Sequence, residues 1–62
     1  MQRYIPFNTI PEILTIKDLM EVLHISRSYA LRLVQDKLIP AHKIARQWRI
    51  LKADLIEYIV NS

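Results

Sequence analysis

Two segments with a helical spacing of apolar residues follow each other in this chain with only a few residues between them. The apolar face of the first segment consists of Ile16, Leu19, Met20 and Leu23. Thr15 is predicted to cap this helix, because Asp18 follows three residues later and completes a capping box. The helix is expected to end at Leu23 or His24, and Ser26 is the next capping residue. The turn is too short for two helices lying flat and antiparallel, so we expect them to cross steeply.

The second helix is predicted to run from Arg27 to about Asp36. Its buried face consists of Ala30, Leu33 and Val34. Because each residue of a helix is turned by about 100°, Ser28, Arg32 and Gln35 point away from that face. The flanks of the exposed face are formed by Arg27, Tyr29 and Leu31. Such a face is either a solvated surface without a binding role or a binding surface.

After Leu38-Ile39-Pro40 the apolar residues alternate instead of following a helical period. His42 and Ile44 alternate with Lys43 and Ala45, and Trp48 and Ile50 alternate with Arg49 and Leu51. We expect a two-stranded ribbon with Arg46 and Gln47 at its tip, one apolar face that includes His42, and one basic face. We expect Trp48 to pack against the core.

A helical period returns from Lys52 to Val60, with Leu55, Ile56 and Ile59 facing inward and Asp54 near the positive end of the helix dipole. The predicted order is helix, helix, two-stranded wing, helix. This is a mainly α fold with a small β-hairpin wing, that of a winged helix-turn-helix domain over residues 14–62. Residues 1–13 hold two prolines and no helical period, and are predicted to form an extended or irregular N-terminal arm.

The size of the chain limits its function. A domain of 62 residues buries only about 60% of its unfolded surface, which makes a deep enclosed active site improbable. The chain has no cysteine, so neither a disulfide nor a thiolate zinc site supports the small core. It has no apolar run near the length of a membrane span and no secretory signal pattern at its start. We therefore expect a cytoplasmic protein without membrane contact.

Positive charge is concentrated in one part of the sequence. Residues 26–52 hold seven basic residues and one acidic residue, a net charge of +6, whereas the remaining residues carry −3. A clustered basic face most often meets a polyanion such as DNA, although a solvated surface would have the same composition.

Several short motifs occur together in the order typical of one family. They are Leu14-Thr15, Ser26-Arg27, Ile39-Pro40-Ala41, Trp48-Arg49-Ile50, and Asp54-Leu55 with Tyr58. In this ordered set the chain resembles the small winged helix-turn-helix domains of excisionases and the related MerR-like DNA-binding proteins, over residues 14–60. The resemblance implies that the second helix enters the major groove of double-stranded DNA while the wing around Arg46 reaches the adjacent backbone or minor groove.

The resemblance also implies two alternative roles. One is an excisionase, a recombination directionality factor that bends DNA for an integrase or other recombinase. The other is a small transcriptional regulator bound to repeated operator sites. Because a single module buries little surface, either role requires several copies bound cooperatively or help from a partner protein. No coiled coil follows the third helix, which argues against the effector-sensing MerR regulators.

Candidate DNA-binding residues follow from the exposed face of the second helix and from the wing. On the helix they are Ser26, Arg27, Ser28, Tyr29, Arg32 and Gln35, and on the wing Lys43, Arg46, Gln47 and Arg49. Arg32 could pair with guanine while Ser28 or Gln35 bonds a base edge. The helix N-terminus can face a phosphate, and the wing cations suit phosphate contacts that position the protein.

Other functions fit the sequence less well. His24 and His42 lack a third ligand at a sensible spacing, and the acidic residues suggest no catalytic pair. We therefore expect no enzymatic activity, no metal and no cofactor. A protein-interaction module whose basic face docks on an acidic partner remains an alternative.

The chain contains no glycine, although such domains often have glycine at their turns. The corresponding residues are His24, Lys37 and Ala45. If these turns are left-handed, each costs about 1 kcal/mol or more relative to glycine. The sequence thus predicts either a different turn geometry or a loss of stability.

Overall fold

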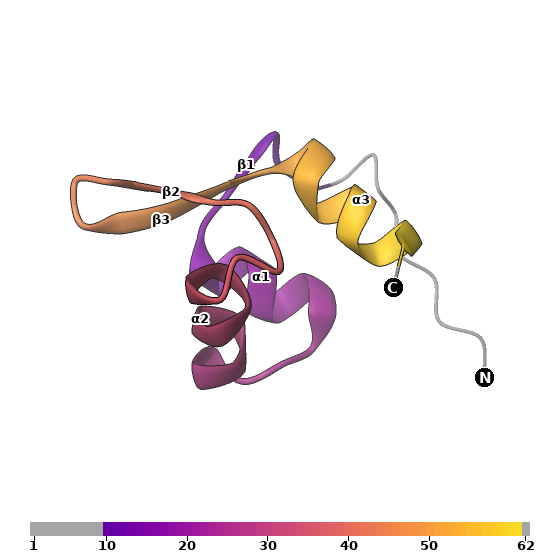
Figure 1. Cartoon of the computed structure of the whole chain (residues 1–62), viewed down its shortest axis with the longest axis horizontal. Coiled ribbons are helices and arrows are strands. Elements are labelled where there is room, and N and C mark those ends of the chain that lie inside the picture. The colour runs from indigo at the N-terminus through magenta and orange to yellow at the C-terminus, as the bar shows by residue number, and fades with distance from the viewer. Residues whose placement is uncertain (1–9, 62) are drawn as a thin grey trace.

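The computed structural model describes residues 10–61, so most of the predicted arm, residues 1–9, lies outside the described residues. The elements are β1 (Ile13–Leu14), α1 (Ile16–Leu23), α2 (Arg27–Gln35), β2 (His42–Ile44), β3 (Gln47–Leu51) and α3 (Lys52–Asn61). The predicted order of helix, helix, wing and helix is confirmed (Figure 1). The strand β1 was not predicted, because two residues give no periodic signal.

The two N-terminal helices begin and end as local hydrogen bonds dictate. The Thr15 hydroxyl accepts from the Asp18 N–H at 3.2 Å, and the Thr15 N–H donates to the Asp18 carboxylate at 3.0 Å, which confirms the capping box. Each helix closes with a bond that spans five residues, from the Ile25 N–H to the Met20 carbonyl and from the Leu38 N–H to the Leu33 carbonyl. This closure requires a left-handed residue just before the donor. Figure 1 shows α2 running across α1 rather than alongside it.

The left-handed residues stand where glycine was expected. His24 has φ 57°, Lys37 has φ 61° and Ala45 has φ 52°. Arg46, with φ 68°, is a fourth left-handed residue that the sequence did not indicate. The turns therefore keep the geometry that favours glycine although none of these residues is glycine.

The wing belongs to a three-stranded antiparallel sheet in the order β1-β3-β2, with β3 in the centre. Its two-residue turn is Ala45-Arg46, and positive φ at both positions makes it a type I′ turn. The predicted tip, Arg46 and Gln47, is therefore wrong by one residue, because Gln47 already pairs with Ile44.

This register also corrects the predicted division into an apolar and a basic face. Cross-strand partners share a face of the sheet, and His42 pairs with Arg49 while Lys43 pairs with Trp48. His42 is exposed rather than turned inward. Each face of the wing thus mixes apolar and basic side chains.

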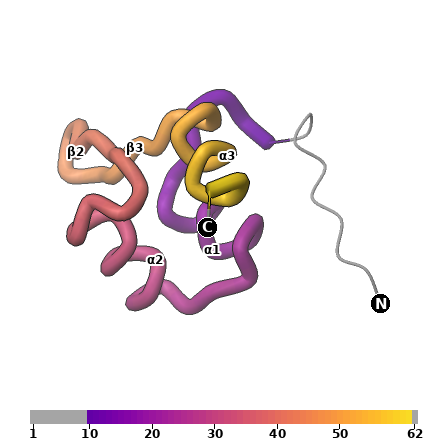
Figure 2. Tube along the Cα trace, turned by 45° about the vertical axis from the view of Figure 1, so that its right-hand side comes forward, coloured from indigo at the N-terminus to yellow at the C-terminus, as the bar shows by residue number. Residues whose placement is uncertain are grey.

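The core lies where the helices meet the central strand. The fully buried large side chains are Leu14, Leu19, Leu33, Ile39, Ile50 and Leu55. Ala30 and Val34 complete the predicted inner face of α2, and Ile10 extends the core toward the N-terminus. Trp48 packs against this core, as predicted. Figure 2 shows the wing projecting to one side of the body and α3 lying against the body beyond it.

Candidate nucleic-acid interface

A groove runs between α2 and the wing, with a volume of about 450 Å³. We call it the wing groove and define it by its lining residues: Thr15, Ile16, Lys17, Arg27, Leu31, Gln35, Lys43, Arg46, Gln47, Trp48 and Arg49. Five of these residues are cationic, and they come from α1, α2 and the wing. None of the described charged side chains is buried, so these cations face solvent.

The side of α2 that faces the groove follows from helical spacing. Arg27, Leu31 and Gln35 lie four residues apart and therefore form one row along the helix. The buried face of the same helix, formed by Ala30, Leu33 and Val34, adjoins this row. Packing of α2 on the core thus places Arg27 and Gln35 toward the wing.

The start of α2 is held by its cap. The Ser26 hydroxyl accepts from the Tyr29 N–H at 3.2 Å and lies 3.3 Å from the Ser28 hydroxyl. Both serines are exposed, and Tyr29 is 48% exposed. These three residues surround the N-terminus of α2 but do not line the wing groove.

The wing supplies its cations from two strands and a tight turn. Lys43 Nζ lies 5.2 Å from the centroid of the Trp48 ring, the geometry of a cation–π contact. Arg46 occupies the turn, while Gln47 and Arg49 lie on β3. All of these wing residues line the groove.

Lys17 is a groove residue that the sequence analysis missed. It lies in the first turn of α1, is exposed, and lines the groove beside Thr15 and Ile16. In the sequence it belongs to the part with net negative charge, far from the basic segment. Only the packing of α1 against α2 brings it to the wing, so no local pattern could have identified it.

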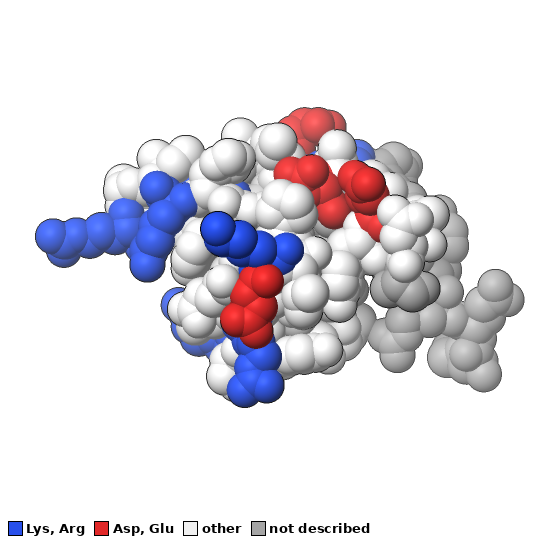
Figure 3. Space-filling model, in the orientation of Figure 1, with Lys and Arg blue, Asp and Glu red and all other residues white. Residues whose placement is uncertain are grey.

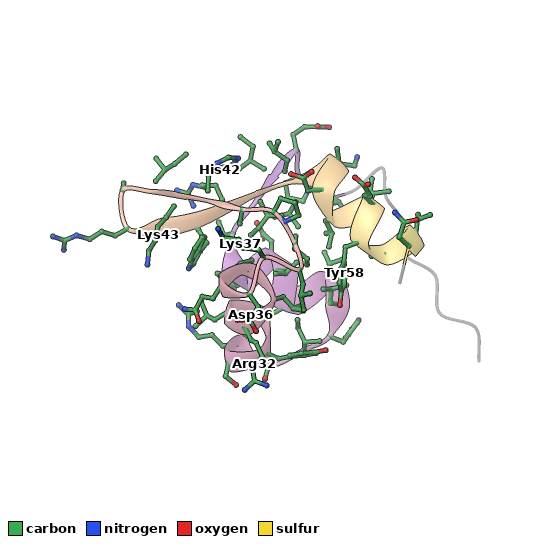
Figure 4. All side chains as sticks on the ribbon, viewed as in Figure 1. Arg32, Asp36, Lys37, His42, Lys43 and Tyr58 are labelled. Atoms are coloured by element: carbon green, nitrogen blue, oxygen red, sulfur yellow. The ribbon has the colours of Figure 1, made fainter. Side chains whose placement is uncertain are left out.

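Six of the ten predicted site residues line the groove, namely Arg27, Gln35, Lys43, Arg46, Gln47 and Arg49. Arg32 does not, because it is turned by about 100° from Leu31 around the helix axis. In Figure 4, Arg32 lies at the lower end of the view, away from Lys43 and the wing, with Asp36 and Lys37 above it. Arg32 therefore occupies the outer edge of α2 instead of the groove.

Charge is divided between the two ends of the visible face. Figure 3 shows basic side chains over the wing and α2, and acidic side chains gathered over the region of α3. Asp36 stands between the basic residues Arg32 and Lys37. The end with the wing is therefore the one suited to an anion.

Two structural features are absent from residues 10–61. None of the helices in this range is long and apolar enough to cross a membrane. Nor do three or more side chains of the types that ligate metals gather in the described part of the chain.

Comparison with known protein families identifies the family of this chain. Residues 13–61 match the family described as the helix-turn-helix domain. No curated protein and no solved structure matches this chain.

Proposed function

The chain belongs to the helix-turn-helix domain family and binds DNA sequence-specifically, and on this premise we propose how it does so. One strand of the double-stranded DNA backbone lies along the wing groove. The observation that supports this proposal is that α1, α2 and the wing all contribute cations to one open groove. Backbone phosphates attract such a cluster regardless of base sequence.

With the DNA backbone in the wing groove, α2 and the wing lie on either side of it, and each faces a different groove of the duplex. A major groove about 12 Å wide admits one helix, so α2 enters it with Ser28, Arg32 and Gln35 toward the bases. Arg32 is then the candidate for a bidentate bond to guanine. On the other side of the backbone strand, Arg46 at the tip of the wing reaches toward the minor groove.

The remaining residues contact the DNA backbone in this proposal. Lys43, Arg49 and Arg27 contact phosphates, and Lys17 adds a contact from α1. The exposed residues Ser26 and Tyr29, at the start of α2, can present hydroxyl groups to a phosphate, and Gln47 can do so with its amide from the wing.

The biological role that we propose is that of an excisionase. A single module of this kind buries only about 600–1,000 Å² of protein surface, so useful occupancy requires adjacent copies or a partner protein. An excisionase that binds adjacent sites and acts with an integrase has both the adjacent copies and the partner protein. The second candidate is a transcriptional regulator bound to repeated operator sites, which the same small interface would favour. We assign no catalytic group and no cofactor to the chain.

Selection of bound duplexes from a random pool tests this function. We expect an enriched site with repeated half-sites, and we expect log affinity to fall with log salt by about 0.9 for each phosphate neutralised. A pool that yields no enriched sequence, with binding restricted to acidic proteins, would instead support the protein-interaction alternative. Measuring recombination and promoter activity on the selected sites then separates an excisionase from a regulator.

A further inference from the structure

A second hollow lies between α3 and the link that follows α2, with a volume of about 410 Å³. We call it the α3 hollow. The link contributes Lys37, Leu38 and Pro40, and α3 contributes Asp54, Glu57, Tyr58 and Asn61. None of these residues lines the wing groove. In Figure 4, Lys37 lies below the wing and Tyr58 lies below α3.

The α3 hollow combines apolar surface with two acidic groups and one cation, Lys37. Leu38 is 58% exposed, Pro40 is exposed and Tyr58 is partly buried, so large apolar side chains stand open to solvent. Asp54 and Glu57 are three residues apart on α3 and therefore lie on the same side of the helix. Over residues 10–61 the structure holds one ion pair, between Lys52 and Glu12, so neither carboxylate of the hollow is paired.

Unpaired carboxylates beside exposed apolar side chains favour a ligand that carries a cation next to an apolar group. DNA does not fit, because its phosphates would face two carboxylates against a single lysine. The basic surface of another copy of this chain, which covers the wing and α2, is engaged with DNA in the proposed function. Charge complementarity therefore favours a basic protein segment over nucleic acid, and occupation of the chain's own basic surface by DNA favours a different protein over a second copy.

We propose that the α3 hollow is a docking site for a short segment of a partner protein that carries Lys or Arg next to a large aliphatic or aromatic residue. The cation of the segment lies against Asp54 and Glu57, and its apolar side chain packs on Leu38, Pro40 and Tyr58. The wing projects from the side of the molecule opposite α3, so both surfaces can be occupied at the same time (Figure 1). This last point and the exclusion of a second copy rest on the proposed function.

Selection from a phage-displayed library of random twelve-residue peptides, with the wild-type chain as target, tests the site. We expect the enriched peptides to share a Lys or Arg beside a large apolar residue. A synthetic peptide of the enriched sequence should shift the amide resonances of Leu38, Asp54 and Tyr58 in a nitrogen-15 titration. Glu57→Lys should weaken its binding roughly tenfold, since one charge pair becomes a repulsion.

Glu21→Lys is the matched control, because it makes the same charge change at an exposed position of α1 that does not line the hollow. It should leave peptide affinity unchanged. Leu38→Ser should also weaken binding, and thermal melting of each variant shows whether it folds. If Glu57→Lys proves unfolded, Leu38→Ser against Glu21→Lys still decides the outcome.

The proposal is overturned if no peptide family is enriched, if the enriched peptides lack a cation, or if the shifts map to the wing. It is equally overturned if Leu38→Ser abolishes a concentration-dependent association of the chain with itself, because the occupant is then a second copy. Repeating the titration with the chain saturated by its selected duplex should give the same peptide affinity. If no duplex binds, the proposed function fails, while the titration of the free chain still decides the docking site.

Discussion

Lys43 and Trp48 face each other across the two strands of the wing, with the Lys43 ammonium 5.2 Å from the centroid of the indole ring. Trp48 also packs against the core, so the same ring joins the wing to the body of the domain and supports the cation. Exposed contacts of this kind contribute about 0.5–1 kcal/mol. The contact holds Lys43 over the wing groove before any ligand binds.

Replacing this cation tests its role toward the DNA backbone. In Lys43→Met we expect the affinity for every duplex to fall by a similar factor, because a phosphate contact carries no base information. The slope of log affinity against log salt should shrink by about 0.9. Fluorescence anisotropy on a selected site and on a scrambled duplex provides both quantities.

Lys37→Asn is the control for net charge, since asparagine tolerates the left-handed backbone of Lys37 and this residue lies outside the wing groove. Its salt slope should stay close to that of the wild type. An equal loss of slope in both variants would show that overall charge, rather than contact at the groove, governs binding.

Lys17 gives a sharper test of the groove, because the basic segment of the sequence does not include it. We expect Lys17→Met to weaken binding to selected and scrambled duplexes alike, as Lys43→Met does. Lys17→Arg should retain most of the affinity. If Lys17→Met binds like the wild type, the DNA backbone does not extend to α1.

Arg32 is expected to behave differently from the cations of the groove. As the candidate for a guanine contact, Arg32→Ala should relax base preference at one position of the selected site, with a discrimination loss of about 1–3 kcal/mol there. Arg27→Ala is the comparison, since Arg27 lines the groove and should affect all sequences alike. Repeating the duplex selection with both variants measures the difference. An Arg32→Ala variant with an unchanged site preference would exclude this residue from base recognition.

The elements that the sequence predicted well are those fixed by local interactions. The capping box of Thr15 and Asp18 depends on residues three apart, and the buried face of α2 depends on one helical period. Both features can be predicted without knowledge of the rest of the chain. The turn geometry at the ends of α1 and α2, by contrast, is left open by the sequence, and the φ angles of His24 and Lys37 decide it.

The features that could not be predicted from the sequence depend on distant segments or on the register of the wing strands. Placing the wing turn at Ala45-Arg46 instead of Arg46-Gln47 changes every cross-strand partner, and with it the residues that share a face. Pairing of Ile13 with Leu51 needs a partner 38 positions away, and Lys17 reaches the groove only through helix packing. Alternation alone contains none of this information.

The cap of α1 should contribute measurably to stability. In Thr15→Ala the Asp18 N–H loses its acceptor, and we expect the free energy of unfolding to fall by about 1 kcal/mol. Thr15→Ser keeps a hydroxyl and should lose much less. Urea denaturation of the three proteins provides the comparison. Equal stability of Thr15→Ala and the wild type would mean that the cap is replaced by solvent at little cost.

The left-handed turn after α1 offers the opposite change, a stabilising one. His24 has φ 57°, and the bond from the Ile25 N–H to the Met20 carbonyl holds it there. Glycine adopts this conformation without a steric penalty, so we expect His24→Gly to stabilise the domain by up to about 1 kcal/mol. For a domain of this size that corresponds to a rise of about 4–8 °C in the thermal midpoint. His24→Ala keeps the penalty while removing the imidazole, and should not share the gain. A lower midpoint in His24→Gly than in the wild type would mean that the imidazole contributes more to the native state than the backbone conformation costs.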